Sequence, residues 1–403
     1  MRRIFFLVTS LTSIISAAVA SPLSDLTTAN NRFAVSLYHE LAGAGSGNLV
    51  FSPISLGTAL SMAYAGARGV TASQMEDVLQ IAPLKQNVHS AQREMSNSLQ
   101  ANCNSDTSAL LTIANAAWSA GCAPKSQFVE LVEAQYDAEA RRLASSPSEN
   151  ARLINEWAAQ HTANRIREVV TPEMLDTQLA MVITNAVYFL GRWEYPFKAR
   201  HTQPGQFWLN RESRVDVLLM HQDVPSSSVR YLETDLFQAI ELPYRESSAA
   251  LTIFLPREKD GLRALASLVT EEWLQAQLNS MTLTDGKVDL SLPKVKTSGK
   301  SSMGKVLKAV GMPRAFEPYS ADFSGICGSP GDVYIGDVMH ATYLEIDERG
   351  TEAAAVTAIM MEVTSMPERP KYTFHCDHPF LFLIRDTSTN AILFMGQILD
   401  PRQ

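Results

Sequence analysis

The amino-acid sequence predicts a single α+β domain. Apolar residues recur at helical spacing in the first part of the chain, whereas short β-branched and aromatic runs dominate the later part. An apolar content of 46% and a charged content of 19% describe a globular chain with a large core. No linker, charge block or internal repeat divides the 403 residues. Helices that come early and strands that come late favour a mostly antiparallel sheet.

Three segments in the first part are predicted to be helices. A helical pattern of apolar residues follows the possible capping residues Asn30 and Asn31 and ends at Gly43. Ser52-Pro53 supplies a cap and a proline at the first helical position, and the run of small and apolar residues behind it ends at Gly66. The segment 150–166 carries one apolar face, which fits a helix packed on something broad and flat.

Short extended runs follow, each bounded by glycine, proline or aspartate. Their β-branched and aromatic content favours strands over helices. The predicted strands are 181–190, 237–242, 251–255, 288–292, 343–346, 380–384 and 392–395.

The N-terminus resembles a cleaved export signal. Arg2 and Arg3 precede an apolar run that ends at Val19, and Ala18-Val19-Ala20 has the small residues that a signal peptidase requires. We therefore expect residues 1–20 to be a signal peptide and residues 21–403 to be the mature domain, secreted to the extracellular space, or to the periplasm if the source is bacterial. No later segment is long and apolar enough to suggest a membrane partner.

The charge distribution argues against a polyanionic partner. The net charge is −8, and the lysines and arginines are scattered instead of forming a basic stripe. We expect neither nucleic-acid binding nor a strong glycosaminoglycan site.

Four cysteines would meet an oxidising compartment after export. Cys103, Cys122, Cys327 and Cys376 allow three complete pairings, and the sequence does not choose among them. A bridge from Cys103 to Cys122 closes the shortest loop, yet free buried thiols are equally consistent with the pattern.

No motif pairs a nucleophile with a base, so the chain is not predicted to be an enzyme. Possible metal ligands gather only in His375-Cys376-Asp377-His378. Because neighbouring side chains of an extended segment point to opposite faces, one ion could rarely reach all of them. A structural role is the stronger interpretation, and we expect neither a metal nor a cofactor.

Dense, ordered sequence blocks carry a resemblance to a known family. The most specific are Asn48-Leu49-Val50-Phe51-Ser52-Pro53-Ile54-Ser55, Thr184-Asn185-Ala186-Val187-Tyr188-Phe189, Ala321-Asp322-Phe323-Ser324-Gly325 and His378-Pro379-Phe380-Leu381-Phe382. From about Asn30 to Pro401 the chain resembles the serpins, a family of serine protease inhibitors. The resemblance implies a large central, mostly antiparallel sheet with additional sheets, about eight or nine helices, a monomer, and an exposed reactive-centre loop at about 348–370.

One further block resembles the hinge of inhibitory serpins. It reads Glu348-Arg349-Gly350-Thr351-Glu352-Ala353-Ala354-Ala355-Val356-Thr357. Local propensity alone would favour a surface helix here. Read as a strand, however, the segment places Thr351, Ala353, Ala355 and Thr357 on one uncharged face, and Glu352 and Glu362 on the other. A loop that becomes a strand buried on one face needs this pattern, so the inhibitory branch is implied.

Five residues match other working parts of the family. By resemblance, Ser52, Ser55, Asn185 and His340 form the shutter, a polar cluster beneath the strands that must part. Trp193 matches the breach, where loop insertion begins. In purely structural terms, the first four residues are buried polar groups that satisfy one another's hydrogen bonds. Trp193 is then an ordinary part of the core. Both interpretations can hold at once.

The family's usual spacing from Glu348 places the reactive bond between Thr364 and Ser365. A shift by up to two residues would make Val363 or Met366 the residue before the cut, although Pro367 disfavours the latter.

These candidate residues are uncharged and of small to medium size. No lysine or arginine lies between Thr351 and Glu368, so trypsin-like targets are disfavoured. Elastase-like, chymotrypsin-like or subtilisin-like proteases are the expected partners, each trapped as a covalent acyl-enzyme complex. The alternative is a non-inhibitory member that carries a ligand or acts as a chaperone.

Overall fold

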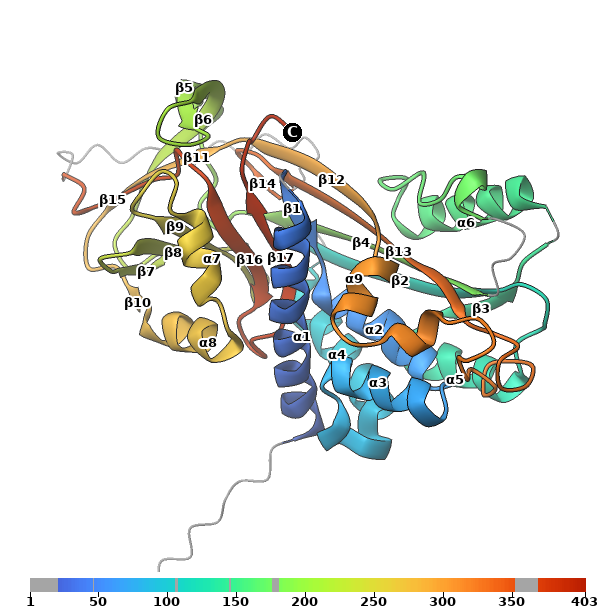
Figure 1. Ribbon diagram of the computed structural model, residues 1–403. Helices are drawn as coiled ribbons and strands as arrows, with labels where there is room; N and C mark the ends of the chain where they lie inside the picture. Colours follow the sequence, from blue (N-terminus) through green and yellow to red (C-terminus); the bar gives the residue numbers. More distant parts are fainter. Residues whose placement is uncertain (1–20, 46, 106–107, 145, 176–180, 352–368) are drawn as a thin grey trace, which may run out of the picture.

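The computed structural model describes residues 21–45, 47–105, 108–144, 146–175, 181–351 and 369–403. This part of the chain forms three sheets and nine α-helices (Figure 1). The helices are α1 (Pro22–Ala44), α2 (Pro53–Tyr64), α3 (Gly69–Leu79), α4 (Val88–Cys103), α5 (Ser126–Tyr136), α6 (Pro147–His161), α7 (Leu262–Leu268), α8 (Glu271–Ser280) and α9 (Gly304–Ala309).

A six-stranded sheet crosses the middle of the molecule (Figure 1). Its strands, in spatial order, are β12 (Val295–Ser302), β13 (Ile335–Ile346), β14 (Gly350–Thr351), β4 (Met181–Arg192), β2 (Ala109–Ser119) and β3 (Glu139–Arg142).

Helices cover both faces of this sheet. Trp157 of α6 packs edge-on against Trp118 of β2, with ring centroids 6.1 Å apart. The neighbouring strand residue Asn115 lies on the opposite face, toward α2, because side chains of a strand alternate. The expected broad, flat partner of the segment 150–166 is therefore this sheet, and α6 covers it.

The structure contains two further sheets. The seven-stranded sheet consists of β1 (Leu49–Phe51), β17 (Ile392–Ile398), β16 (Phe380–Asp386), β9 (Ala249–Pro256), β8 (Phe237–Pro243), β7 (Arg230–Glu233) and β10 (Thr282–Leu283), all paired antiparallel. The four-stranded sheet consists of β15 (Tyr372–His375), β11 (Val288–Pro293), β6 (Arg214–Val224) and β5 (Gln203–Trp208).

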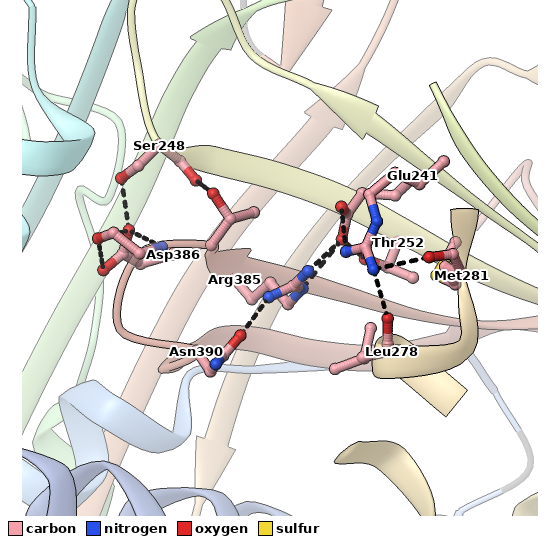
Figure 2. Close-up of polar contacts among 11 residues, drawn as sticks. Glu241, Ser248, Thr252, Leu278, Met281, Arg385, Asp386 and Asn390 are labelled. Atoms are coloured by element: carbon pink, nitrogen blue, oxygen red, sulfur yellow. Dashed lines mark hydrogen bonds and ion pairs between the residues drawn. The ribbon is translucent and has the colours of Figure 1, made fainter. Parts of the chain in front are cut away.

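A buried ionic network ties the seven-stranded sheet to α8 (Figure 2). Arg385 donates from Nη2 to Oε2 of Glu241 at 2.5 Å, and the two side chains are only 2% and 6% exposed. Arg230 donates to the other carboxylate oxygen at 3.2 Å and to the carbonyl oxygens of Leu278 and Met281. Thr252 donates a further hydrogen bond to Glu241, so the buried carboxylate is fully surrounded by donors.

Each predicted strand corresponds to a strand of the structure, although several strands are longer than expected. β13 begins at Ile335, whereas the prediction covered only 343–346. The alanine-rich strand β2 was missed, because it is covered on both faces and its apolar run does not alternate.

Helix boundaries differ at both ends. α6 runs from Pro147 to His161, so it ends before the predicted limit at Ile166. α1 begins at Pro22, well before Asn31, because Ser21 caps it by accepting a hydrogen bond from the Ser24 amide. Ser52 caps α2 in the same way, as its sequence predicts.

The disulfide differs from the shortest closure that the sequence offers. Cys122 pairs with Cys327 across 205 positions of sequence, while Cys103 and Cys376 are buried free thiols. Burial raises the pKa of Cys103 to about 12 and that of Cys376 well above its ordinary value. None of the described helices is both long and apolar enough to cross a membrane.

Candidate functional site

The central feature of the six-stranded sheet is a seam between two parallel strands. β13 pairs in parallel with β4 from Ile335 opposite Met181 to Tyr343 opposite Tyr188. At one end of this seam the short strand β14 lies between them, with Thr351 opposite Gly191 of β4 and Ile346 of β13. Both of these pairings are antiparallel. Two strands that are neighbours along most of their length are therefore parted at one end.

A row of polar side chains crosses the middle of the seam. His340 of β13, Asn185 of β4 and Asn115 of β2 lie at the same level of the sheet. His340 Nδ1 lies 2.5 Å from Asn185 Oδ1, and Asn185 Nδ2 donates to Asn115 Oδ1 at 2.6 Å. All three side chains are buried. The row is a side-chain link between strands that also pair through their backbones.

The N-terminus of α2 completes this cluster. The backbone amide of Ser52 donates to His340 Nε2 at 3.0 Å, and Asn185 donates to the hydroxyl and the carbonyl of Ser55. Because Nε2 accepts and the partner of Nδ1 is a carbonyl oxygen, a neutral imidazole with its proton on Nδ1 satisfies both contacts. Burial lowers the pKa of His340 to about 3, which agrees with the neutral form.

A second cluster holds β14 at the parted end. Trp193 stacks on Tyr244 with ring centroids 4.7 Å apart, and its indole donates to the carbonyl of Asp347 at 2.9 Å. The Tyr244 hydroxyl lies 2.6 Å from the hydroxyl oxygen of Thr351, whose side chain is fully buried. The face of the hinge that carries Thr351 thus points into the core.

Gly350 allows the chain to approach β4 closely. A β-carbon at this position would lie 1.9 Å from the carbonyl oxygen of Gly191, and the backbone φ is +156°. Only glycine fits so tight an approach without displacing backbone.

Glu348 is anchored just before β14. Its carboxylate accepts hydrogen bonds from Lys294 and from the Thr202 hydroxyl, each at 2.9 Å. Burial alone would raise the pKa of Glu348, but the hydrogen bonds from Lys294, from a backbone amide and from Thr202 together outweigh it and leave that pKa below its ordinary value. The carboxylate is therefore ionised at neutral pH and secures the start of the hinge.

The sequence-predicted residues divide between described and undescribed parts of the chain. Ser52, Ser55, Asn185 and His340 form one cluster, and Trp193 lies beside Glu348, Gly350 and Thr351 at the parted end of the seam. Outside the described residues lie Ala353, Ala354, Ala355, Thr357, Val363, Thr364, Ser365 and Met366.

Sequence reasoning missed four residues of these clusters. Asn115 is the one polar residue in the run 113–118, and that isolation was a usable signal for a buried polar contact. Thr202, Lys294 and Tyr244 were given no role from the sequence.

The histidines near the C-terminus have protein partners. His378 Nε2 lies 2.7 Å from the Pro256 carbonyl, and His375 Nε2 lies 3.0 Å from Asp289. Within the described ranges, no three histidine, cysteine, aspartate or glutamate side chains are arranged to hold a metal ion.

Comparison with known proteins agrees with this geometry. The sequence pattern of the family described as "Serpin (serine protease inhibitor)" matches residues 28–401. An uncharacterized serpin-like protein of Thermococcus kodakarensis is 36% identical, over 92% of this chain and 85% of its own. Serpin B8 of Homo sapiens is 33% identical, over 94% of this chain and 100% of its own.

A solved structure shows the same fold. Serpin48 of the insect Tenebrio molitor, described as a highly specific serpin, superposes with a TM-score of 0.82 at 29% identity, covering 93% of this chain and 98% of its own. A three-sheet α+β protein with a partly opened parallel seam is thus the class that fold and site define. The chain belongs to the serpin family, and the predicted fold is confirmed.

Proposed function

We propose that the protein is an inhibitory serpin, a suicide substrate of serine endopeptidases, with cysteine endopeptidases as a second target class. Cleavage of the loop at about 348–370 lets its hinge insert as a strand into the seam between β13 and β4, with the acyl-enzyme still attached. The single observation that carries this proposal is β14, which already lies between the two strands in antiparallel register. The sheet accepts the first residues of the loop before any cleavage.

Continuation of this register fills the seam. Each residue added after Thr351 advances one position along β4, so residue 361 would stand opposite Met181, the first residue of that strand. The same face that carries Thr351 would then carry Ala353, Ala355 and Thr357, all small enough to pass between strands. An inserted strand of about 14 residues spans roughly 45 to 50 Å, which exceeds the length of the seam.

Insertion has a thermodynamic drive. The parallel pairing of β13 with β4 is replaced by two antiparallel pairings, which are slightly more stable per residue and double the number of strand contacts at the seam. The opposing cost is the His340–Asn185 link, which must part as the strand passes. The uncleaved state is therefore held by a kinetic barrier.

Trapping acts on the protease. A serine protease attacks the carbonyl carbon of Thr364, its serine Oγ forms an ester, and the amine of Ser365 leaves with the proton relayed by the catalytic histidine. Insertion then draws the ester to the far end of the seam and distorts the attached active site. Loss of one oxyanion-hole donor alone slows such chemistry by roughly 10² to 10³, so hydrolysis of the ester stalls.

The expected targets follow from the residues before the cut. Val363, Thr364 and Met366 are uncharged and of modest size, so they suit elastase-like, chymotrypsin-like or subtilisin-like pockets and give a trypsin-like pocket no cation.

A protease panel tests inhibition. The protein is incubated with elastase, chymotrypsin, subtilisin and trypsin, and complexes that survive boiling in detergent are sought. We expect complexes with at least one of the first three. Cleavage without any adduct would support a carrier or chaperone role instead. Mass spectrometry of the released C-terminal peptide should show a new N-terminus at Ser365, and a start outside 364–367 would refute this reactive bond.

Export and a monomeric state complete the proposal. Export rests on the leader-like residues 1–20. The monomeric state rests on the family resemblance. The protein recovered outside the producing cell should begin at Ser21, and a retained leader would contradict export.

A further inference from the structure

The disulfide joins the two sides of the seam at the end opposite the hinge. This inference rests on the proposed function, because it concerns how far the seam can open. Cys122 belongs to the side that contains β4, β2 and β3, whereas Cys327 belongs to the segment that leads into β13. In Figure 1 the loop before β13 lies beside α5, at the end of the sheet where β3 is drawn.

The attachment of Cys122 to its side is direct. The residue follows β2, whose last residue, Ser119, pairs with Met181 at the start of β4. The Ser119 hydroxyl donates to the Cys122 carbonyl at 2.9 Å, and the Leu143 amide donates to the Ser119 carbonyl at 2.8 Å. A shift of β4 and β2 therefore carries Cys122 with it.

Cys327 is attached to the other side. The segment before it packs on the turn between α2 and α3, where the Gly325 amide donates to the Gly66 carbonyl at 3.0 Å and the Arg68 amide donates to the Asp322 carbonyl at 2.9 Å. A β-carbon on Gly66 would lie 2.1 Å from Ile326, so this contact is tight. Helix α2 touches both sides of the seam, because its Ser52 amide donates to His340 of β13 and its Ser55 accepts from Asn185 of β4. Cys327 is therefore joined to the β13 side by the segment 328–334, which leads from it into β13.

The geometry limits separation at this end. The two cysteine Cα atoms are 5.9 Å apart. A disulfide tolerates up to about 6.8 Å, whereas an inserted strand would part its neighbours by about 4.8 Å more. With the bridge intact, the far end of the seam can open by one full strand only if the connecting segments 120–121 and 328–334 change conformation. Lys125 adds two non-covalent links across the same junction, to the carbonyls of Ile326 and Ser324.

We infer that Cys122–Cys327 is a redox-controlled latch on the seam, slowing strand insertion while oxidised and releasing it when reduced. A dithiol reductant supplies the chemistry. One of its thiolates attacks Cys122 Sγ, the S–S bond breaks, and Cys327 leaves as a thiolate that takes up a proton. The second thiol of the reductant then displaces the Cys122 thiol and becomes a cyclic disulfide.

The positions of the four cysteines suit this role. Cys122 is only half-buried, so a reductant reaches one sulfur of the bridge, whereas Cys327 is buried. Cys103 and Cys376 are fully buried, and their raised pKa values keep them as unreactive thiols that do not exchange with the bridge.

The test measures insertion in uncleaved, folded protein. A synthetic peptide with the sequence of residues 351–364 is incubated with oxidised and with dithiothreitol-reduced protein, and its incorporation is followed by native electrophoresis. We expect incorporation to be at least about fivefold faster after reduction, because a bridge that constrained only the unfolded chain would leave this rate unchanged. Reduction is applied to the folded protein, so no variant needs to refold.

Two variants serve as controls. The double variant Cys122→Ser/Cys327→Ser should incorporate the peptide at the fast rate with or without reductant. Cys103→Ser keeps the bridge and should behave as the unmodified protein does. A response to reductant in the double variant would assign the effect to another thiol and overturn the latch.

The remaining outcomes separate this inference from the proposed function. Equal incorporation rates in oxidised and reduced protein, with detergent-stable protease complexes in both states, would overturn the latch alone. No incorporation and no complex in either state would remove strand insertion itself, and the latch with it.

Discussion

The seven-stranded and six-stranded sheets are built on opposite principles. In the seven-stranded sheet every strand pair is antiparallel, and the Arg385–Glu241 pair is fully buried within it (Figure 2). In the six-stranded sheet a parallel pair, β13 with β4, runs through the centre and is already parted at one end by β14. Under the proposed mechanism a strand is added to the six-stranded sheet at this position, whereas the seven-stranded sheet keeps its strands. The comparison teaches that a sheet proposed to convert and a sheet proposed to stay unchanged can share one core.

The largest expected effect is on the six-stranded sheet. Cleavage between Thr364 and Ser365 should raise the unfolding temperature by roughly 10 °C or more, because insertion adds a ladder of backbone hydrogen bonds on both sides of the new strand. Differential scanning calorimetry of intact and cleaved protein measures the change. Equal unfolding temperatures for intact and cleaved protein would contradict insertion of the loop into the six-stranded sheet.

A charge on the buried face of the hinge should block insertion almost completely. Thr351→Arg would place a guanidinium against the Tyr244 hydroxyl in a fully buried position, at a cost of several kcal/mol. We expect the protease to cleave this variant without forming a detergent-stable complex. Thr351→Val, which keeps the size of the side chain, should still form complexes. Equal complex yields from the two variants would contradict the assigned face.

The seven-stranded sheet should show the converse behaviour. Arg385→Met leaves the Glu241 carboxylate buried with one fewer cation, which should lower the free energy of unfolding by about 3–5 kcal/mol. Urea titration measures this loss. The ratio of complex to cleaved product should stay unchanged at temperatures where the variant is folded.

A matched control for this variant is the exposed pair Arg152–Glu156. Arg152→Ala should lower the free energy of unfolding by no more than about 1 kcal/mol, since the two side chains are 57% and 51% exposed. A changed ratio of complex to cleaved product in Arg385→Met would show that the two sheets are coupled.

The seam should also respond to acid through His340. Its pKa is about 3 in the folded protein and about 6.5 in an unfolded chain, so between these pH values the unfolded state binds a proton that the folded state does not. The free energy of unfolding should therefore fall as pH drops from about 6.5 toward 3, by at most about 1.4 kcal/mol per pH unit from this group.

Urea titrations at several pH values on the protein and on His340→Gln would isolate this contribution. The variant should have a shallower dependence on pH, although other groups titrate in both proteins. If the free energy of unfolding depends on pH identically in the two proteins, His340 does not contribute to that dependence.

The smallest effect is expected at the anchor of the hinge. Lys294→Met removes the ion-pair partner of Glu348. Because the lysine side chain is 38% exposed, the free energy of unfolding should fall by only about 0–1 kcal/mol. Thr202 still donates to the carboxylate. Inhibitory activity should decline modestly faster on storage. A decrease in the free energy of unfolding as large as that of Arg385→Met would place the main restraint at the hinge instead of in the core.

Much of the fold could be read from local patterns. Strand β16 was found from its continuous apolar run, and α2 from the cap at Ser52, because both signals depend only on near neighbours in sequence. The family resemblance supplied the cluster of Ser52, Ser55, Asn185 and His340, which no local signal would have assembled.

The sequence by itself determined the fold class, the order of the strands along the chain and the uncharged face of the hinge. Tertiary structure decided that β13 and β4 lie side by side in parallel, that Asn115 joins the polar row, and that Cys122 pairs with Cys327. The physical reason is the separation in sequence over which each kind of interaction acts. Alternation and capping act between neighbours, whereas a seam, a shared hydrogen-bond row and a disulfide join segments that only the completed core brings together.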